Sequence, residues 1–114
     1  MSYEIKPSVT FLVEAKKLKK RYRSFEDDLD DFKKSLQDNP FQGAELCPGI
    51  RKIRMPIASK GRGKSGGARV ITANAIIAEH EGRIALLTIY DKADHATVDV
   101  KVVRQMAREL GFDI

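Results

Sequence analysis

Residues 68–91 read ARVITANAIIAEHEGRIALLTIYD and contain two β-like runs separated by a turn signal. The first run, Ala68 to His80, is rich in residues that favour strands. Glu81-Gly82 is expected to form the turn, and the second run, Arg83 to Asp91, is apolar enough to be a central strand. The stretch therefore predicts a hairpin around which the other elements assemble.

Residues 50–57, which precede this hairpin, alternate in the way that a strand requires. The side chains point to two faces: Arg51, Ile53 and Met55 to one, and Ile50, Lys52 and Arg54 to the other. Apolar Ile53 and Met55 should face the helices. Lys52 and Arg54 should then share the opposite, open face of the sheet.

Two helices are expected before this strand. Tyr3 to Lys6 predict a short first strand that Pro7 ends, and Ser8 is a candidate N-cap. The apolar residues of the first helix follow helical spacing: Phe11, Ala15, Leu18 and Tyr22. Those of the second helix do the same: Phe25, Leu29, Phe32 and Leu36. Together these helices predict a hairpin with one face directed at the sheet.

The second helix should begin at Ser24, with Asp27 as a partner resembling a capping box, and end at Asn39-Pro40. A last amphipathic helix is expected to end at Gly111. Its apolar stripe comprises Val98, Val102, Met106 and Leu110. The segments 41–49 and 59–67 are expected to be loops, the second flexible and basic.

These elements predict one α+β domain over residues 1–114, with the order β-α-α-β-β-β-α. The sheet should be small and antiparallel-rich, with the helical hairpin packed on one face. A length of 114 residues fits one domain.

The positive charge of the chain is concentrated in its middle. The formal net charge is +5, and residues 41–69 hold seven cations against one anion. Residues 1–40 hold nine cations and eight anions, and residues 70–114 hold five and seven. A basic stretch on a sheet favours a polyanionic partner such as nucleic acid.

Several function classes find little support in the composition. The single cysteine, Cys47, excludes an internal disulfide, and no Cys/His cluster suggests zinc. No apolar run reaches 18 residues, and the N-terminus does not resemble a secretory signal, so a cytoplasmic protein without a membrane partner is expected. Gly63-Lys64-Ser65 lacks the earlier glycine of a phosphate loop, because Ala58 stands there.

The remaining chemistry is that of lysine and arginine on a sheet, which suffices to cleave RNA. The ribose 2′-OH attacks the neighbouring phosphorus, and fixed cations stabilise the charge that develops on the phosphate oxygens. A lysine near other cations can also act as a base. This chemistry needs neither a metal nor a cofactor.

Three segments resemble the RelE/ParE toxin superfamily, and its HigB-like branch in particular. They are Gly49-Ile-Arg-Lys-Ile-Arg54, Gly63-Lys-Ser-Gly-Gly-Ala-Arg-Val-Ile71 and Leu86-Leu-Thr-Ile-Tyr-Asp-Lys92. The resemblance implies a RelE-like toxin of a type II toxin–antitoxin pair. Many members cleave messenger RNA on the ribosome. The antitoxin is usually encoded by the adjacent gene, and here a helix-turn-helix protein is expected.

The resemblance also implies a set of site residues. Lys52, Arg54, Arg69 and Lys92 match catalytic cations, and Arg69 matches the arginine that contacts the scissile phosphate. Tyr90 and His95 are the nearby candidates for acid or base. Lys60, Arg62 and Lys64 are candidate contacts to RNA phosphates.

The chain departs from the family pattern at four positions: Ile50, Ala68, Ala93 and Asp99. Two alternatives to the ribonuclease remain open, the first of them because of these departures. One is an inactive member that binds its antitoxin and acts in regulation. The other is a ParE-like inhibitor of gyrase.

Overall fold

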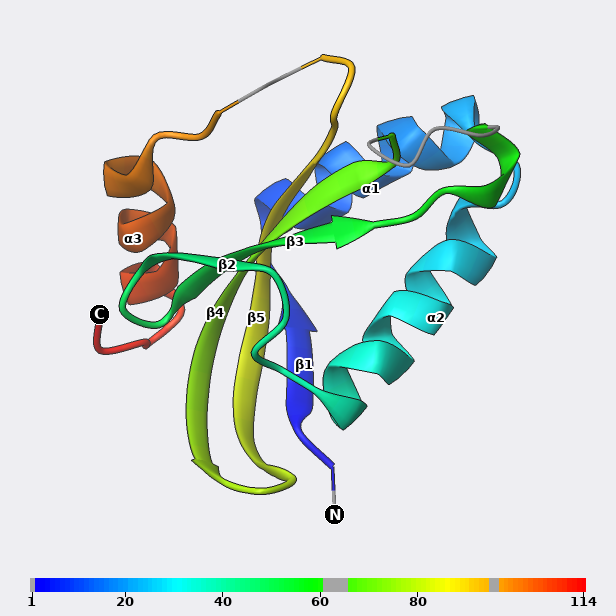
Figure 1. The fold of residues 1–114 in the computed structure, drawn as a ribbon. Helices are drawn as coiled ribbons and strands as arrows, with labels where there is room; N and C mark the ends of the chain where they lie inside the picture. Colours follow the sequence, from blue (N-terminus) through cyan, green and yellow to red (C-terminus); the bar gives the residue numbers. More distant parts are fainter. Residues whose placement is uncertain (1, 61–65, 95–96) are drawn as a thin grey trace.

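The computed structural model describes residues 2–60, 66–94 and 97–114. Within these residues the chain forms five strands, three α-helices and one short 3-10 turn (Figure 1). The strands are β1 (Glu4–Pro7), β2 (Ala44–Cys47), β3 (Ile50–Met55), β4 (Ala68–Ala78) and β5 (Glu81–Asp91). The helices are α1 (Val9–Arg21), α2 (Phe25–Asp38) and α3 (Val100–Glu109), and the turn is η1 (Ala58–Lys60). The predicted α+β class is confirmed.

The strands form one sheet with the order β1-β5-β4-β3-β2. The long β4–β5 hairpin lies at its centre, as expected from residues 68–91. Three of the four neighbouring pairs are antiparallel, whereas β1 runs parallel to β5. The sheet is therefore mixed rather than purely antiparallel, because the chain passes through two helices and three strands before it returns beside β1.

Two local predictions about strands and turns were wrong. Segment 41–49 was expected to be a loop, but Ala44–Cys47 forms β2 and pairs with β3. Its Gly and Pro residues belong to the turns that flank this edge strand. The β4–β5 turn consists of Glu79 and His80 rather than Glu81-Gly82, and His80 adopts a φ of 59°. The added β2 extends the expected element order by one strand.

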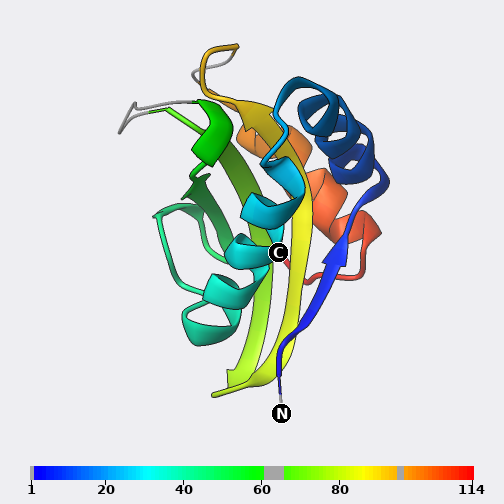
Figure 2. The same ribbon diagram turned by 90° about the vertical axis from the view of Figure 1, so that its right-hand side faces the viewer.

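The helical hairpin packs on one face of the sheet, as predicted. Ile53 and Met55 are buried against it in a core that also contains Phe11, Phe25 and Leu36. Figure 2 shows the sheet between α2 and α3, so the two faces have separate cores. The predicted register of β3 is therefore confirmed.

A serine stands at the N-terminus of both α1 and α2, but only the first forms the side-chain hydrogen bond of a cap. Ser8 caps α1 as expected, because its Oγ accepts a hydrogen bond from the Phe11 N–H at 3.0 Å. The predicted partnership of Ser24 with Asp27 is wrong. The Ser24 hydroxyl donates instead to Asp28 Oδ2 at 2.6 Å, and Asp28 in turn accepts from the Ala58 N–H. This carboxylate thereby connects α2 to η1.

Helix α3 covers part of the opposite face, with a buried side that differs from the predicted one. Val103 and Ala107 are buried in the second core, whereas Val102 is 55% exposed. The predicted stripe repeats every four residues and drifts around a helix of 3.6 residues per turn, so it cannot stay on one buried face. The end of the helix is as expected: Gly111 has a φ of 90°, and the Phe112 N–H bonds to the Ala107 carbonyl at 3.0 Å.

Among the described residues, no helix combines the length and the apolar character that crossing a bilayer requires.

The corrected face of α3 can be tested with two adjacent valines. Val103→Ala should lower the free energy of unfolding by about 2 kcal/mol, because it removes buried methyl groups and leaves a cavity. Val102→Ala should change it by less than about 0.5 kcal/mol, since that side chain is largely in solvent. Urea denaturation followed by circular dichroism measures both. Equal losses would mean that the helix presents a different side to the sheet.

Candidate nucleic-acid interface

Three of the predicted site residues lie side by side on adjacent strands. Arg54 of β3 is paired with Arg69 of β4, and Arg69 is paired with Tyr90 of β5. The residues next to them in the strands point into the core on the side of α1 and α2: Met55, Ala68, Val70 and Ile89. Alternation therefore places Arg54, Arg69 and Tyr90 in one row on the opposite face. We call these three residues the arginine row.

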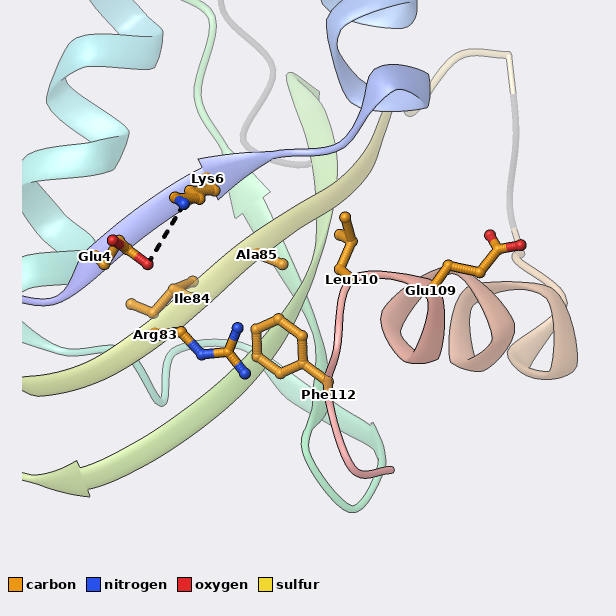
Figure 3. A pocket seen from close by; sticks show the side chains of 8 residues that line it. All are labelled: Glu4, Lys6, Arg83, Ile84, Ala85, Glu109, Leu110 and Phe112. Atoms are coloured by element: carbon orange, nitrogen blue, oxygen red, sulfur yellow. Dashed lines mark ion pairs between the residues drawn. The ribbon is translucent and has the colours of Figure 1, made fainter.

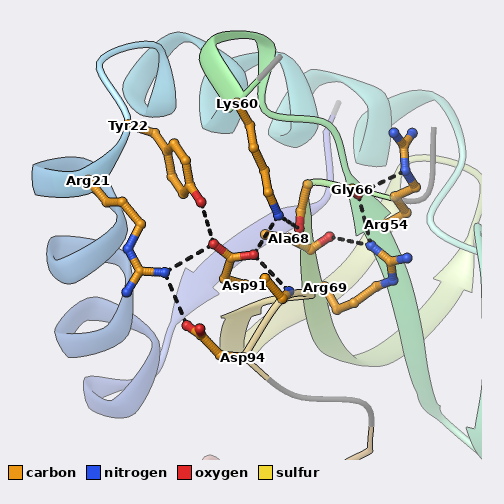
Figure 4. Close-up of polar contacts among 11 residues, drawn as sticks. Arg21, Tyr22, Arg54, Lys60, Gly66, Ala68, Arg69, Asp91 and Asp94 are labelled. Atoms are coloured by element: carbon orange, nitrogen blue, oxygen red, sulfur yellow. Dashed lines mark hydrogen bonds and ion pairs between the residues drawn. The ribbon is translucent and has the colours of Figure 1, made fainter. Parts of the chain in front are cut away.

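The two arginines converge on the end of the basic loop. Arg54 Nε and Arg69 Nη1 each donate to the carbonyl of Gly66 at 3.3 Å (Figure 4). Arg69 Nη1 also donates to the Ala68 carbonyl at 3.2 Å. Because a charged group is costly to place at the start of an interior strand, these backbone oxygens stabilise the Arg69 guanidinium there. These bonds orient both guanidinium groups toward the same end of the sheet.

Gly67 makes this approach of the loop possible. It adopts a φ of 82°, and a Cβ atom there would lie 2.5 Å from the Met55 carbonyl oxygen. A side chain at this position would therefore push the loop end away from β3. The Gly66-Gly67 pair sets the position of the carbonyl that both arginines contact.

Tyr90 completes the row as a phenol that keeps its proton. Burial raises the pKa of Tyr90, and the positive charge of Arg69 opposes that rise without reversing it. A phenol in this state can donate a hydrogen bond or a proton. The hydroxyl oxygen itself is buried, and both roles predicted for Tyr90, acid and base, stay predictions.

The other predicted cations lie around the row. Lys52 is half-buried and pairs with Ile71, so it occupies the next row on the same face. Lys92 is exposed just beyond β5, and its backbone N–H donates to the Gly67 carbonyl at 3.1 Å. Arg62, Lys64 and His95 lie outside the described residues.

Lys60 has a partner that the sequence did not indicate. Its Nζ lies 2.6 Å from Asp91 Oδ1 and 3.5 Å from the Gly67 carbonyl oxygen. The Lys60 side chain is 21% exposed, whereas that of Asp91 is 1% exposed. Its predicted contact with an RNA phosphate would have to compete with this buried carboxylate.

Asp91 collects donors from three elements, and we call this group the Asp91 cluster. Besides Lys60 of η1, it accepts from the Tyr22 hydroxyl at 2.5 Å and from Arg21 Nη1 at 3.0 Å. The Ala93 N–H adds a fourth bond at 2.9 Å. Burial acts to raise the pKa of Asp91, but the bonds from Lys60 and Tyr22 outweigh it and hold that pKa well below its usual range.

The pKa values of the donors Tyr22 and Arg21 shift upward, opposite to that of Asp91. The bond to Asp91 raises the pKa of the Tyr22 phenol, so Tyr22 remains a donor. Arg21 also bonds Asp94 at 3.1 Å, and this contact, together with those to Tyr22 and Asp91, raises the pKa of the guanidinium. The cluster is therefore a carboxylate held ionised by protonated donors.

The Asp91 cluster fixes both ends of the basic loop. Lys60 precedes the loop, and Gly67, which follows it, accepts hydrogen bonds from Lys60 and from the Lys92 backbone. Gly66, next to Gly67, carries the carbonyl that contacts both arginines. The cluster thus supports the arginine row through the backbone of the glycine pair. In the sequence, its one signal is a carboxylate at the end of the apolar run RIALLTIYD.

The four positions that the resemblance set apart each lie in a structural contact. Ile50 and Ala68 are fully buried, one in each core. Ala93 donates its N–H to Asp91, and the Asp99 side chain caps α3 by accepting from the Lys101 N–H at 2.9 Å. These residues serve packing and capping.

No protein-family model matches this sequence. Within the described part of the chain, no group of three or more His, Cys, Asp or Glu residues could hold a metal ion.

Asp91→Asn tests whether the carboxylate charge supports the fold. At pH 7 the variant should lose about 2–3 kcal/mol of unfolding free energy. Breaking a fully buried ion pair costs about 3–5 kcal/mol. The loss should be smaller here because Arg21 and Lys60 retain solvent access. Folding lowers the pKa of Asp91 from an ordinary value of about 3.9, so its contribution is complete above roughly pH 5 and is lost as the pH falls.

The stabilities of wild type and Asp91→Asn should consequently converge in acid. Urea denaturation at pH 7, 5, 4 and 3 measures this convergence. Exposed Asp113→Asn is the matched control and should stay within about 0.5 kcal/mol of wild type at pH 7. A difference between wild type and Asp91→Asn that persists unchanged at pH 3 would show that charge is not what Asp91 contributes.

Proposed function

We propose that the protein is the toxin of a type II toxin–antitoxin pair, and that it cleaves messenger RNA on the ribosome without a metal. The arginine row is the observation that carries this proposal. Two like charges placed opposite each other on adjacent strands destabilise a sheet. Arg54 and Arg69 nevertheless occupy such a pair, next to a protonated tyrosine, and an anionic substrate gives this arrangement a purpose.

The row has the groups that phosphate-centred chemistry requires. The two guanidinium groups can bind the non-bridging oxygens and stabilise the charge that grows on them in the transition state. The 2′-oxygen forms a bond to phosphorus, the bond from phosphorus to the 5′-oxygen breaks, and the Tyr90 phenol supplies a proton to the departing 5′-oxygen. A 2′,3′-cyclic phosphate and a 5′-hydroxyl result.

The 2′-hydroxyl proton passes to a base outside the row, and Lys52 is our candidate for that base among the described residues. Lys52 lies one row away on the same face, and His95 lies outside the described residues. Lys52 and Lys92 add positive charge on either side of the row. Ribosomal RNA and messenger RNA are the polyanions that this face would meet, which places the activity in the cytoplasm.

An inactive, antitoxin-binding member of the superfamily is the second candidate. One observation favours it: Lys60, a candidate contact to an RNA phosphate, is held by Asp91. Such a protein would retain RNA or antitoxin binding without cleavage. In either case the expected protein partner is a helix-turn-helix antitoxin encoded by the adjacent gene.

Cleavage on programmed ribosomes tests the enzyme. Arg69→Ala should lower the rate roughly 30- to 1,000-fold, by analogy with the loss of one donor to a transition-state oxyanion. Arg69→Lys should restore only part of it, because an ammonium cannot reproduce the bidentate fork. Lys34→Ala, which removes an exposed cation of α2, is the matched control and should cleave as wild type does.

The result separates the two candidates. A folded wild type that cleaves no messenger RNA on ribosomes but binds its antitoxin would contradict the enzyme and leave the inactive binding protein. A folded Arg69→Ala variant that cleaves at the wild-type rate would contradict the location of the site.

Salt dependence distinguishes the arginine row from Lys60. Arg54→Ala and Arg69→Ala should each reduce the slope of log affinity against log salt by about 0.7 for single-stranded RNA. Lys60→Ala should instead lower the unfolding free energy and leave the slope nearly unchanged, because its amine is bound to Asp91. Fluorescence anisotropy with labelled RNA measures the slopes. The salt concentration should run over roughly 50–300 mM, where the effect of counterion release on affinity is large. If Lys60→Ala reduces the slope as much as Arg69→Ala does, Lys60 contacts RNA phosphates and the assignment of its amine to Asp91 alone is wrong.

A further inference from the structure

A groove of about 300 Å³ lies between α1 and α3, over the end of β5. Thr10 and Glu14 of α1 form one wall, and Val102 and Met106 of α3 form the other. Figure 1 shows β5 running up between these two helices. The volume is at the lower end of the range of about 300–1,000 Å³ that small-ligand sites occupy.

The groove is continuous with the arginine row. Tyr90, the last member of the row, also lines the groove together with its β5 neighbours Thr88 and Ile89. A nucleotide whose phosphate lies at Arg69 would therefore have the groove beside it, on the far side of Tyr90. This continuity connects the cavity to the function proposed above.

The walls of the groove favour an uncharged, flat group over another phosphate. Two carboxylates, Glu14 and Asp99, line it and would repel an anion. Val102 and Met106 offer an apolar surface, and Thr10 and Thr88 offer hydroxyls. Single-stranded RNA is read by proteins through unstacked bases, which rest on such surfaces and form hydrogen bonds along their edges.

Glu14 gives the groove a preference among bases. One of its oxygens, Oε2, accepts a bond from Lys17 at 3.1 Å, and the other, Oε1, accepts no hydrogen bond from the residues that the structure describes. Carboxylates accept hydrogen bonds from exocyclic amino groups such as N4 of cytosine. Adenine and cytosine carry an amino group on the pairing edge, whereas uracil carries a carbonyl there.

We propose that the groove between α1 and α3 is a nucleobase subsite that accepts an amino-bearing base next to the phosphate bound by the arginine row. The proposal rests on the RNA-binding function proposed above and adds a base preference to it. Phosphate contacts at the row then supply affinity, and the groove supplies discrimination.

A second cavity of similar size does not have these properties. It lies between β1 and the end of α3 and is lined by Arg83 and Phe112, among others (Figure 3). The Arg83 guanidinium stacks 4.5 Å from the centre of the Phe112 ring and bonds the Gly111 carbonyl. Its charged group is thus already engaged within the chain, and the cavity has no contact with the arginine row.

The test compares the affinity of the full chain for single-stranded oligonucleotides of equal length composed of adenosine, cytidine or uridine, and for an abasic strand. Wild type should bind the adenosine and cytidine strands about 5- to 100-fold more tightly than the uridine strand, which is the range for one well-placed base contact. The abasic strand should be weakest. Fluorescence anisotropy at constant salt measures all four.

Val102→Trp should fill the groove from an exposed position and remove the difference between bases while leaving the salt slope unchanged. Glu14→Gln should reduce the ratio between the affinities for the cytidine and uridine strands, while the loss of its negative charge raises the affinity for all strands by a similar factor. Ile77→Trp is the matched control, since Ile77 is 77% exposed on β4 and does not line the groove. Arg69→Ala should weaken binding to every strand, the abasic one included.

Equal binding of all four strands by wild type would overturn the subsite and leave the arginine row intact. A folded Val102→Trp variant that keeps the base preference would also overturn the subsite. So would a Val102→Trp variant that binds the abasic strand more weakly than wild type does. Val102→Trp that binds RNA as wild type does but no longer binds the antitoxin would assign the groove to a protein partner. Failure of wild type to bind any strand would overturn the RNA-binding function and the subsite together.

Discussion

A carboxylate buried at the end of a central strand must be ionised and surrounded by donors, or else be replaced by an apolar group. Asp91 meets this requirement through Arg21, Tyr22 and Lys60, which come from α1, the residue that follows it, and η1. Because a buried charge loses much of its stabilisation when a partner is removed, these elements are held in one arrangement. The position of the Gly66-Gly67 pair, and with it that of the arginine row, follows from that arrangement.

The same constraint gives the basic residues different partners. Lys60 carries its charge into the Asp91 cluster, where the charge is compensated by the carboxylate. Arg54 and Arg69 donate instead to the backbone carbonyl of Gly66, which orients both guanidinium groups. Arg54 also lines a pocket together with Asp28 and Asp31 of α2. Among the described cations of the basic segment, Lys60 therefore holds the loop end, whereas Arg54 and Arg69 meet at the Gly66 carbonyl.

The arginine row and the groove place two kinds of recognition next to each other. The row is cationic and suits phosphate, whereas the groove is apolar with carboxylates at its border. Tyr90 belongs to both, so a single nucleotide could contact both through its phosphate and its base. This division into charge-based affinity and base-based selectivity is a general feature of nucleic-acid recognition.

The sequence by itself determined the fold class, the central hairpin and the two faces of β3, because these depend on periodicity within short segments. Alternation over residues 50–55 was enough to send Ile53 and Met55 to one core and to leave Arg54 on the other face. Only the tertiary structure decided that Lys60 pairs with Asp91, 31 residues away. It also decided that α3 buries Val103 rather than Val102, and that Ala44–Cys47 becomes a strand. Each of these outcomes depends on which surface a segment meets, and that surface is assembled from residues distant in the chain.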